Sequence, residues 1–197
     1  MSRYLVIGSN SFSGSHFVNY LIQKKEYVIG VSRSNEINKV FLPYKWKKTK
    51  TKKFLFKKLD LNKDVSKIIK LIKKCKIDIV VNFASQSMVS QSWLNPLDWY
   101  NTNVISHVKF HDELRKIKFL KKYVHVSTPE VYGSTKNQIK ENYNFAPSTP
   151  YAASRAACDL HLLTFYKNYN FPVVFTRASN VYGPGQQLYR IIPKAIL

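Results

Sequence analysis

Short apolar runs alternate with helically spaced apolar positions along most of the chain. Apolar runs that predict strands lie at residues 4–7, 27–31, 53–59, 77–83, 123–127 and 173–177. Between them, spacings of three and four predict helices around Phe17 to Ile22 and Ile68 to Ile72, and over residues 98–116 and 149–169. Residues 191–197 resemble the opening of another helix. Strands that alternate with helices predict βαβ units and a parallel sheet.

Composition restricts the class of protein. The chain has 197 residues, 45% of them apolar, which suits one large domain with a real core. No run approaches the roughly 20 apolar residues that span a bilayer, and no secretory signal is visible. Cys75 and Cys158 form no CxxC pair, which suits a reducing compartment. We therefore expect a cytoplasmic protein without a membrane partner, and we predict no metal site.

The formal net charge of +21 is unusual, and lysines are densest at residues 45–58. With Trp46, Phe54 and Phe56 between them, these lysines fit a nucleic-acid patch. They also fit a solvated loop that leads into a strand. Lysines are spread along the rest of the chain too, which favours the second interpretation. We do not expect nucleic acid as a partner.

The turn after the first strand resembles a nucleotide-binding loop. It runs from Gly8 to Gly14, with Ser11 in the middle place of a Gly-x-x-Gly-x-x-Gly spacing. Glycines let the backbone approach a pyrophosphate, and the following helix offers its first N–H groups to the phosphates. The position between a strand and a helix supports this assignment, whereas Ser11 departs from the pattern.

The ends of the second and third strands bear on the choice of cofactor. NAD binders tend to place an acid after the second strand, but here Ser32 and Arg33 follow, with no acid before Glu36. Arg33 can pair with a 2′-phosphate, which favours NADP over NAD, or it is one more surface cation. Asp60 is placed either to meet the adenine amine or to cap the next helix.

Two segments carry candidate chemistry. In the first, Thr128 and Glu130 follow a strand and point to the same side if the chain is extended there. In the second, Tyr151 and Arg155 are four residues apart on one helical face. A nearby positive charge favours the tyrosine phenolate, so Tyr151 can act as a base. Alone, each residue fits a structural role, because Tyr151 is one of 13 tyrosines and Thr128 and Glu130 suit a surface turn.

Seven segments together resemble the extended short-chain dehydrogenase/reductase family, and within it the nucleotide-sugar 4,6-dehydratases. They are IGSNSFSG, LDL, NFASQS, NPLDWYNTNV, VHVSTPEVYGS, PSTPYAASRAA and TRASNVYGPGQ, which span almost the whole chain. The resemblance implies an α/β fold with a doubly wound parallel sheet, the Rossmann NAD(P)-binding fold. It also implies a lyase that acts on a nucleotide-diphosphate sugar with tightly bound NADP or NAD.

The resemblance implies roles for individual residues. Tyr151 would be the base for the sugar hydroxyl at carbon 4, Thr128 its orienting partner, and Glu130 the group that removes the proton at carbon 5. Epimerases of this fold usually lack that acid. The implied cofactor-binding residues are Gly8, Ser11, Phe12, Gly14, Ser32, Arg33, Asp60, Leu61, Phe83, Ala84, Ser85, Asn103, Val126, Tyr151 and Arg155. The implied substrate residues are Ser87, Thr128, Glu130 and Asn180.

Two departures from the family pattern affect the proposed chemistry. Arg155 replaces the family's lysine, which keeps the charge but changes the geometry. Pro129 stands where dTDP-glucose dehydratases carry an aspartic acid that helps water leave. GDP-mannose dehydratases lack that acid as well, and Ser32-Arg33 and ASQS look more like the GDP-mannose type. A nucleotide-sugar 4-epimerase or reductase, and a catalytically inactive cofactor- or nucleic-acid-binding fragment, are alternatives.

Family members are considerably longer than this chain. We therefore predict a Rossmann domain over residues 1–180 and the start of a truncated sugar-nucleotide-binding lobe over residues 181–197. The isolated chain is expected to bind cofactor weakly and to turn over poorly or not at all. The family usually forms homodimers through two helices, and Leu160, Leu163 and Phe165 are candidates for that bundle, although core packing explains some of them equally well.

Overall fold

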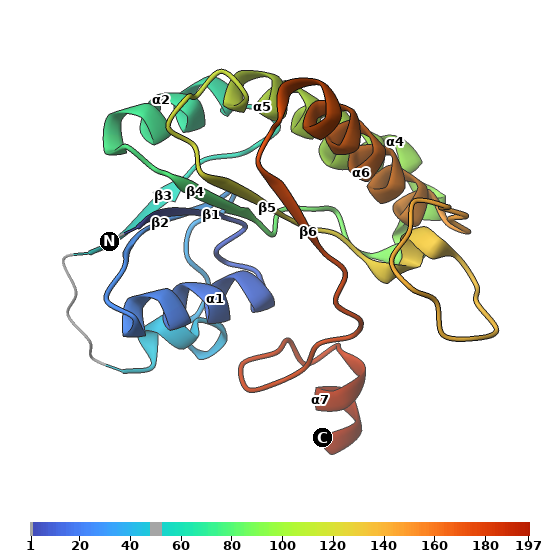
Figure 1. Cartoon of the computed structure of the whole chain (residues 1–197). Coiled ribbons are helices and arrows are strands. Elements are labelled where there is room, and N and C mark those ends of the chain that lie inside the picture. The colour runs from blue at the N-terminus through green and yellow to red at the C-terminus, as the bar shows by residue number, and fades with distance from the viewer. Residues whose placement is uncertain (1, 48–52) are drawn as a thin grey trace.

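A computed structural model describes residues 2–47 and 53–197. Its centre is a six-stranded parallel sheet in the order β3-β2-β1-β4-β5-β6 (Figure 1). The strands are β1 (Arg3–Ile7), β2 (Tyr27–Ser32), β3 (Phe54–Lys58), β4 (Ile79–Asn82), β5 (Lys122–Val126) and β6 (Val173–Thr176). All six predicted strands are present, and the doubly wound parallel sheet is confirmed.

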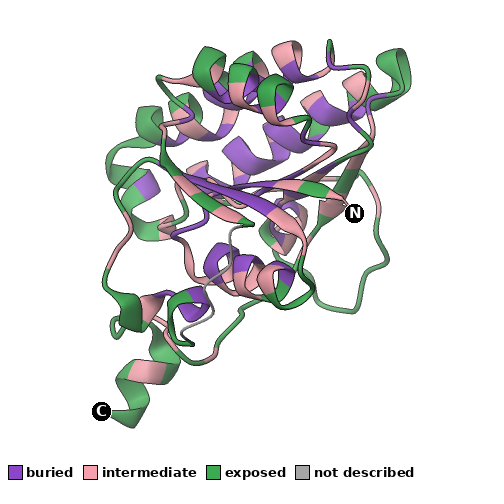
Figure 2. Cartoon of the chain, turned by 90° about the vertical axis from the view of Figure 1, so that its left-hand side faces the viewer, coloured by how far each residue is buried: buried purple, intermediate pink, exposed green. Residues whose placement is uncertain are grey.

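Helices cover both faces of this sheet (Figure 1). On one face lies α1 (Phe12–Gln23), followed along the chain by the 3₁₀ turns η1 (Lys39–Phe41) and η2 (Pro43–Lys45). On the other face lie α2 (Val65–Cys75), α5 (His107–Leu114) and α6 (Pro150–Tyr169). Their apolar sides form two buried clusters against the sheet (Figure 2). Because both faces are covered, the strands read as nearly continuous apolar runs.

The strand order reverses between β1 and β4, which are neighbours in the sheet. The connections that follow two such strands run to opposite faces of the sheet. A crevice therefore opens between them at the carboxyl ends of the strands. Gly8 follows β1 at this point, and Phe83 follows β4. The topology therefore brings the predicted nucleotide loop and the NFAS segment together.

The prediction of a single helix over residues 98–116 is wrong in detail. The structure has α4 (Pro96–Tyr100), a π-helical stretch η3 (Asn101–Ser106) and then α5, preceded by the unpredicted short helix α3 (Val89–Leu94). Pro96 lies in the first turn of α4, where proline fits, so the helical path starts earlier than expected. The wider turns of η3 carry Asn103 into the interior.

The last part of the chain leaves the sheet after β6 and runs to the α1 side (Figure 1). It ends in α7 (Ile191–Ile196), which buries none of its residues (Figure 2). The proposed boundary at residue 180 stays a prediction. Within residues 2–47 and 53–197, no helix has the length and apolarity that a membrane crossing requires.

The basic segment at residues 45–58 does not form a row of exposed rings. Phe54 packs against the apolar cluster beneath α1, 5.0 Å from the ring of Tyr44, and Phe56 is half-buried. Trp46 is exposed, and its Nε1 donates to the Lys39 carbonyl at 2.9 Å. The lysines at positions 48, 50 and 52 lie outside the described residues. The described part of the segment therefore supports a solvated loop that enters a strand.

Candidate active site

The loop between β1 and α1 is closed by glycines that the fold itself requires. Gly8 has φ +81°, and a Cβ atom there would lie 2.8 Å from the Ala84 nitrogen. A Cβ atom on Gly14 would lie 2.2 Å from the Gly8 carbonyl oxygen. Both positions therefore exclude other residues, and the loop presses against the NFAS segment.

Ser11 replaces the middle glycine of the loop without strain. Its φ of −70° is ordinary for any residue, and its Oγ donates to the Gly8 carbonyl at 2.7 Å and accepts from the Gly14 nitrogen at 3.1 Å. The serine is therefore the N-cap of α1. Phe12 follows at the first helical position, and its ring lies against Gly183.

Asn10 is a loop residue that sequence reasoning missed. Its side-chain nitrogen donates to the Asn35 carbonyl at 2.8 Å, and its backbone nitrogen donates to Ser32 Oγ at 2.9 Å. These bonds tie the loop to the end of β2. A polar residue in the turn was the available signal, but only the sheet order shows what the side chain reaches.

Arg33 is exposed at the end of β2, and its Nη1 donates to Gln86 Oε1 at 3.5 Å. The first acid after this strand, Glu36, faces elsewhere: its carboxylate accepts from the Tyr44 hydroxyl at 2.9 Å and from Lys45 Nζ at 2.7 Å. Arg33 is thus the exposed charged side chain at the end of β2.

Asp60 does not cap α2, so that interpretation is wrong. The N-cap is Asp64, and Asp60 Oδ1 instead accepts from the Asn62 nitrogen at 2.9 Å in the turn before it. Leu61, which follows, is buried in the core, so only its backbone is available to a ligand.

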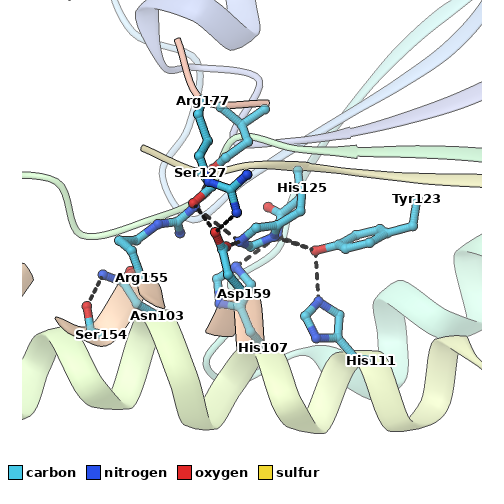
Figure 3. Close-up of polar contacts among 12 residues, drawn as sticks. Asn103, His107, His111, Tyr123, His125, Ser127, Ser154, Arg155, Asp159 and Arg177 are labelled. Carbon is cyan, nitrogen blue, oxygen red and sulfur yellow. Dashed lines mark hydrogen bonds and ion pairs between the residues drawn. The ribbon is translucent and has the colours of Figure 1, made fainter. Parts of the chain in front are cut away.

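Asn103 is fully buried, and its amide holds two segments together. Its Oδ1 accepts from the Gln86 nitrogen at 2.8 Å, and its Nδ2 donates to Ser154 Oγ at 3.0 Å (Figure 3). Its buried amide therefore positions the loop after β4 and is not open at the surface. Phe83, Ala84 and Ser85 are half-buried in that loop, whereas Ser87 is exposed.

The structure brings Thr128, Glu130 and Tyr151 together, although not through the extended chain that we assumed. After β5, Thr128 is extended, but a 3₁₀ turn η4 (Pro129–Tyr132) begins at the next residue. Thr128 Oγ1 accepts from the Glu130 nitrogen at 3.2 Å, and Thr128 lies near enough to Tyr151 to lower the pKa of its phenol. Pro129 favours this turn because it fits the first helical position.

α6 presents Tyr151 at its first turn. Thr149 caps the helix by accepting from the Ala152 nitrogen at 3.0 Å, and the Tyr151 nitrogen donates to Ser92 Oγ on α3 at 3.2 Å. The tyrosine is 8% exposed. Its backbone is thus fixed while its ring lines the surface of the site.

Burial raises the pKa of the Tyr151 phenol above its ordinary value. The Arg155 charge and the Thr128 hydrogen bond oppose this rise, whereas Glu130 and Asp159 add to it. The chain by itself therefore keeps Tyr151 protonated, contrary to what the spacing of Tyr151 and Arg155 suggested. Burial also raises the pKa of Glu130, which brings its carboxyl closer to neutral pH.

Arg155 does not face the cofactor loop as the family's lysine is expected to. Its side chain is 1% exposed, and Nη2 donates to the Val126 carbonyl and, at 3.1 Å, to His125 Nε2 (Figure 3). The long side chain of Arg155 extends past the end of β5 into the layer of side chains beneath that strand. Nε and Nη1 have no hydrogen-bond partner among the described residues.

Around Arg155 lies a buried polar cluster that the sequence did not reveal. It contains His107, His111, Tyr123, His125, Ser127, Asp159 and the largely buried Arg177 (Figure 3). Asn82 joins it by donating from Nδ2 to the Tyr123 hydroxyl. In residues 2–47 and 53–197, no group of three or more His, Cys, Asp or Glu side chains is placed to hold a metal ion. Asn180, predicted to meet the substrate, lies exposed after β6.

Comparison with known proteins identifies related enzymes. The family model for GDP-mannose 4,6 dehydratase matches residues 5–197. The human dTDP-D-glucose 4,6-dehydratase is 34% identical over 98% of this chain and 55% of its own length. A solved dTDP-glucose 4,6-dehydratase from Streptomyces venezuelae, with NAD bound, is 30% identical with a TM-score of 0.85, over 98% of this chain and 60% of that one.

A related solved structure has a different activity. The UDP-N-acetylglucosamine 4-epimerase from Methanobrevibacter ruminantium is 28% identical with a TM-score of 0.82, over 97% of this chain and 59% of its own. The chain thus spans somewhat more than half the length of these relatives.

Proposed function

The chain belongs to the GDP-mannose 4,6-dehydratase family, and we propose that it carries the cofactor-binding and catalytic part of a nucleotide-sugar 4,6-dehydratase, a lyase. The observation that carries the choice of reaction is Glu130. It is an exposed residue of η4 whose backbone nitrogen donates to the buried Thr128, it acts electrostatically on the buried Tyr151, and partial desolvation raises its pKa. A carboxylate held there suits removal of a carbon-bound proton.

The residues of the β1 loop fit a nicotinamide dinucleotide. Gly8 and Gly14 leave no room for a side chain, and α1 begins directly after Ser11. When bound, the nicotinamide would take a hydride from carbon 4 of the sugar and return it at carbon 6. Arg33, with Glu36 engaged elsewhere, supports NADP over NAD, because a guanidinium pairs well with a 2′-phosphate.

The chain's own side chains would handle the protons. Tyr151 would accept the proton of the carbon 4 hydroxyl while Thr128 holds its oxygen. Glu130 would remove the proton from carbon 5, and the bond between carbon 6 and its hydroxyl would break. Since Pro129 offers no acid, the protonated Glu130 is the group that would return a proton to the leaving hydroxyl, so that water departs.

A second copy of the chain is the proposed protein partner. Large apolar side chains stay exposed on α3 and α4, namely Trp93, Leu94 and Leu97, and on the neighbouring α6, where Leu160 is 46% exposed. Exposed apolar side chains gathered on adjacent helices are typical of an interface. For the other two α6 candidates the core-packing alternative fits better, because Leu163 is buried and Phe165 packs against the core.

The test is proton exchange at carbon 5. The chain is mixed at high concentration with GDP-mannose, dTDP-glucose or UDP-glucose and NADP in deuterated buffer. Deuterium at carbon 5 is read by mass spectrometry, and reduced nicotinamide by absorbance. We expect Glu130→Gln to abolish deuterium uptake while the absorbance signal persists. Glu141→Gln, at an exposed position, is the control. Absorbance without any Glu130-dependent uptake would favour an epimerase. Neither signal from a chain that is saturated with NADP and with the nucleotide sugar would contradict the proposal.

A further inference from the structure

The amino ends of the six strands meet at one edge of the sheet, because all six strands are parallel. The segments that enter the strands at this edge are residues 2–3, 24–27, 53–54, 76–79, 115–122 and 170–173. Together these segments contain ten lysine and arginine residues and two acids, Glu26 and Asp78. The fold therefore gathers positive charge that is scattered along the sequence.

Eight of the ten cations form what we call the basic edge. Arg115 and Lys116 are left out, because both pair with Asp112 of α5, at 2.7 Å and 3.2 Å. The basic edge consists of the other eight residues, all of them exposed, namely Arg3, Lys24, Lys25, Lys53, Lys76, Lys118, Lys121 and Lys122. Lys73 and Lys74, exposed in the last turn of α2, adjoin it along the chain.

Contacts between neighbouring strand starts join one half of the basic edge into a continuous surface. Lys53 Nζ, at the start of β3, donates to the Lys25 carbonyl before β2 at 3.0 Å. The guanidinium of Arg3, on β1, lies 5.0 Å from the centre of the Tyr27 ring on β2. The starts of β3, β2 and β1 thus present their cations side by side.

Asp78 joins the other half. Its carboxylate accepts from the Arg3 nitrogen at 2.7 Å and pairs with Lys121 Nζ at 2.8 Å, so it links β1 to the segment that enters β5. Lys76 Nζ lies 5.1 Å from the centre of the Phe119 ring in that same segment. One carboxylate between two cations leaves the surface strongly positive.

This charge does not face the proposed active site. The loops at the carboxyl ends of β1 and β4, residues 8–11 and 83–88, contain no charged residue. A strand of five residues separates the two edges by about 16 Å, which exceeds the screening length of about 8 Å at physiological salt. The basic edge therefore acts on a different partner from the nucleotide of the β1 loop.

Helix ends explain only part of the basic edge. Lys24 and Lys76 are the C-caps of α1 and α2, where the helix dipole favours a cation. Arg3, Lys53 and Lys122, in contrast, lie at the starts of strands, which have no comparable dipole. Their clustering therefore needs a reason other than local helix stability.

The chemistry of the basic edge fits phosphate groups. Seven of its eight cations are lysines, whose ammonium groups pair with phosphates as point charges. Among the residues that the structure describes in the segments of this edge, no large apolar side chain is exposed. The edge thus offers neither an aromatic platform for unstacked bases nor an apolar wedge for a lipid bilayer.

The dimensions of the basic edge fit a duplex. Its strand starts, from β3 across to β5, span about 19 Å at a spacing of about 4.8 Å. Duplex DNA carries one charge per about 1.7 Å of its axis, so a duplex laid along the edge places several phosphates against it.

We propose that the basic edge binds the phosphate backbone of a nucleic-acid duplex without reading its sequence. The expectation against nucleic acid concerned residues 45–58, which share only Lys53 with this surface. The proposal goes beyond the proposed function and does not depend on it, because the two sites lie at opposite edges of the sheet.

The experiment measures fluorescence anisotropy of a labelled DNA duplex of about 20 base pairs with the 197-residue chain, from about 50 to 200 mM KCl. We expect a dissociation constant in the micromolar range at the lowest salt, and a logarithmic salt slope steeper than about −3. The triple variant Lys76→Gln, Lys118→Gln and Lys122→Gln should bind about tenfold more weakly, with a slope reduced by about 2 to 3.

Two control variants test whether position or total charge matters. Lys136→Gln, Lys140→Gln and Lys194→Gln together remove the same charge from exposed positions away from the edge, and should change affinity less than about threefold. Arginine in place of Lys76, Lys118 and Lys122 keeps the charge and should preserve binding. Circular dichroism checks folding, and if the edge triple does not fold, Lys122→Gln alone should reduce the slope by about 1.

Several results would overturn the proposal. These are no binding at the lowest salt, equal loss in the two glutamine triples, and an unchanged slope in the edge variants. Tighter binding to a single strand of the same length would exclude a duplex as the partner. Tighter binding to vesicles that contain phosphatidylserine would assign the edge to a membrane surface instead. Because neither cofactor nor sugar is present, none of these results bears on the proposed dehydratase.

Discussion

The guanidinium of Arg155 donates through Nη2 to Nε2 of His125 at 3.1 Å inside the protein. Because a guanidinium only donates, His125 accepts at Nε2 and carries its proton on Nδ1. The ring is therefore neutral, and its 3.6 Å approach to Asp159 Oδ1 is not an ion pair. The tautomer of His107 is fixed as well, because its Nδ1 donates to the Thr102 carbonyl at 2.7 Å.

These neutral histidines predict that the protein loses stability in mild acid. Burial lowers the pKa of His107 to about 4 from 6.5, and it lowers those of His111 and His125 well below 6.5. The unfolded chain takes up protons near pH 6.5 and the folded chain only at lower pH. The stabilisation is thus complete above pH 6.5 and is lost as the pH falls towards about 4. His107 alone accounts for roughly 3 kcal/mol.

Urea unfolding at pH 7.5 and pH 5 measures this loss. The free energy of unfolding should be clearly lower at pH 5, and His107→Gln should reduce the difference. His16 lies outside the cluster, against the Pro184 carbonyl, so His16→Gln should leave the difference intact. Equal stability at the two pH values would contradict the neutral network.

Arg33→Ala should remove a preference for NADP over NAD. A guanidinium paired with a 2′-phosphate contributes about 1.5 to 3 kcal/mol, so NADP should bind about tenfold to a hundredfold more weakly. NAD binding should change little. Calorimetric titration of both cofactors checks this, with Lys58→Ala at an exposed position of β3 as the control. Equal loss for NAD and NADP would show that Arg33 does not read the 2′-position.

Gly14→Ala should impair both cofactor binding and stability. The added Cβ atom would meet the Gly8 carbonyl oxygen at 2.2 Å, and both are backbone groups of the same tight loop. The loop must open, so we expect a loss of about 1 to 3 kcal/mol in the free energy of unfolding, as for other overpacked sites. Ser13→Ala, one position earlier on α1, is the matched control. A Gly14→Ala chain that binds NADP normally would refute the close approach.

Leu97→Glu should weaken self-association of the chain. Leu97 is 74% exposed on α4, beside exposed side chains of α3, so a charge there disfavours an apolar interface without touching the core. Sedimentation velocity over a range of concentrations measures the effect. Tyr20→Glu, exposed on α1 across the sheet, should leave association unchanged. If the unsubstituted chain is monomeric at every concentration, the proposed dimer is wrong.

The parallel sheet and the position of the nucleotide loop could be predicted from the sequence. Apolar runs located all six strands, because strands covered on both faces are mostly apolar. The spacing of Gly8 and Gly14 located the loop, since only glycine fits where a Cβ would meet backbone. The grouping of Thr128 and Glu130 with Tyr151 came from the family resemblance, because residue spacing alone assumed an extended chain where a 3₁₀ turn begins.

The directions and partners of the polar side chains, in contrast, depend on how the elements pack together. Nothing in the YAASR segment shows that Arg155 turns towards His125, which lies thirty residues away on β5. The four histidines of α5, β5 and α6 are isolated in the sequence and meet only because the helices pack on that strand. Local spacing fixes which face of an element a residue occupies, whereas burial, hydrogen-bond partners and charge balance depend on what other elements bring to that face.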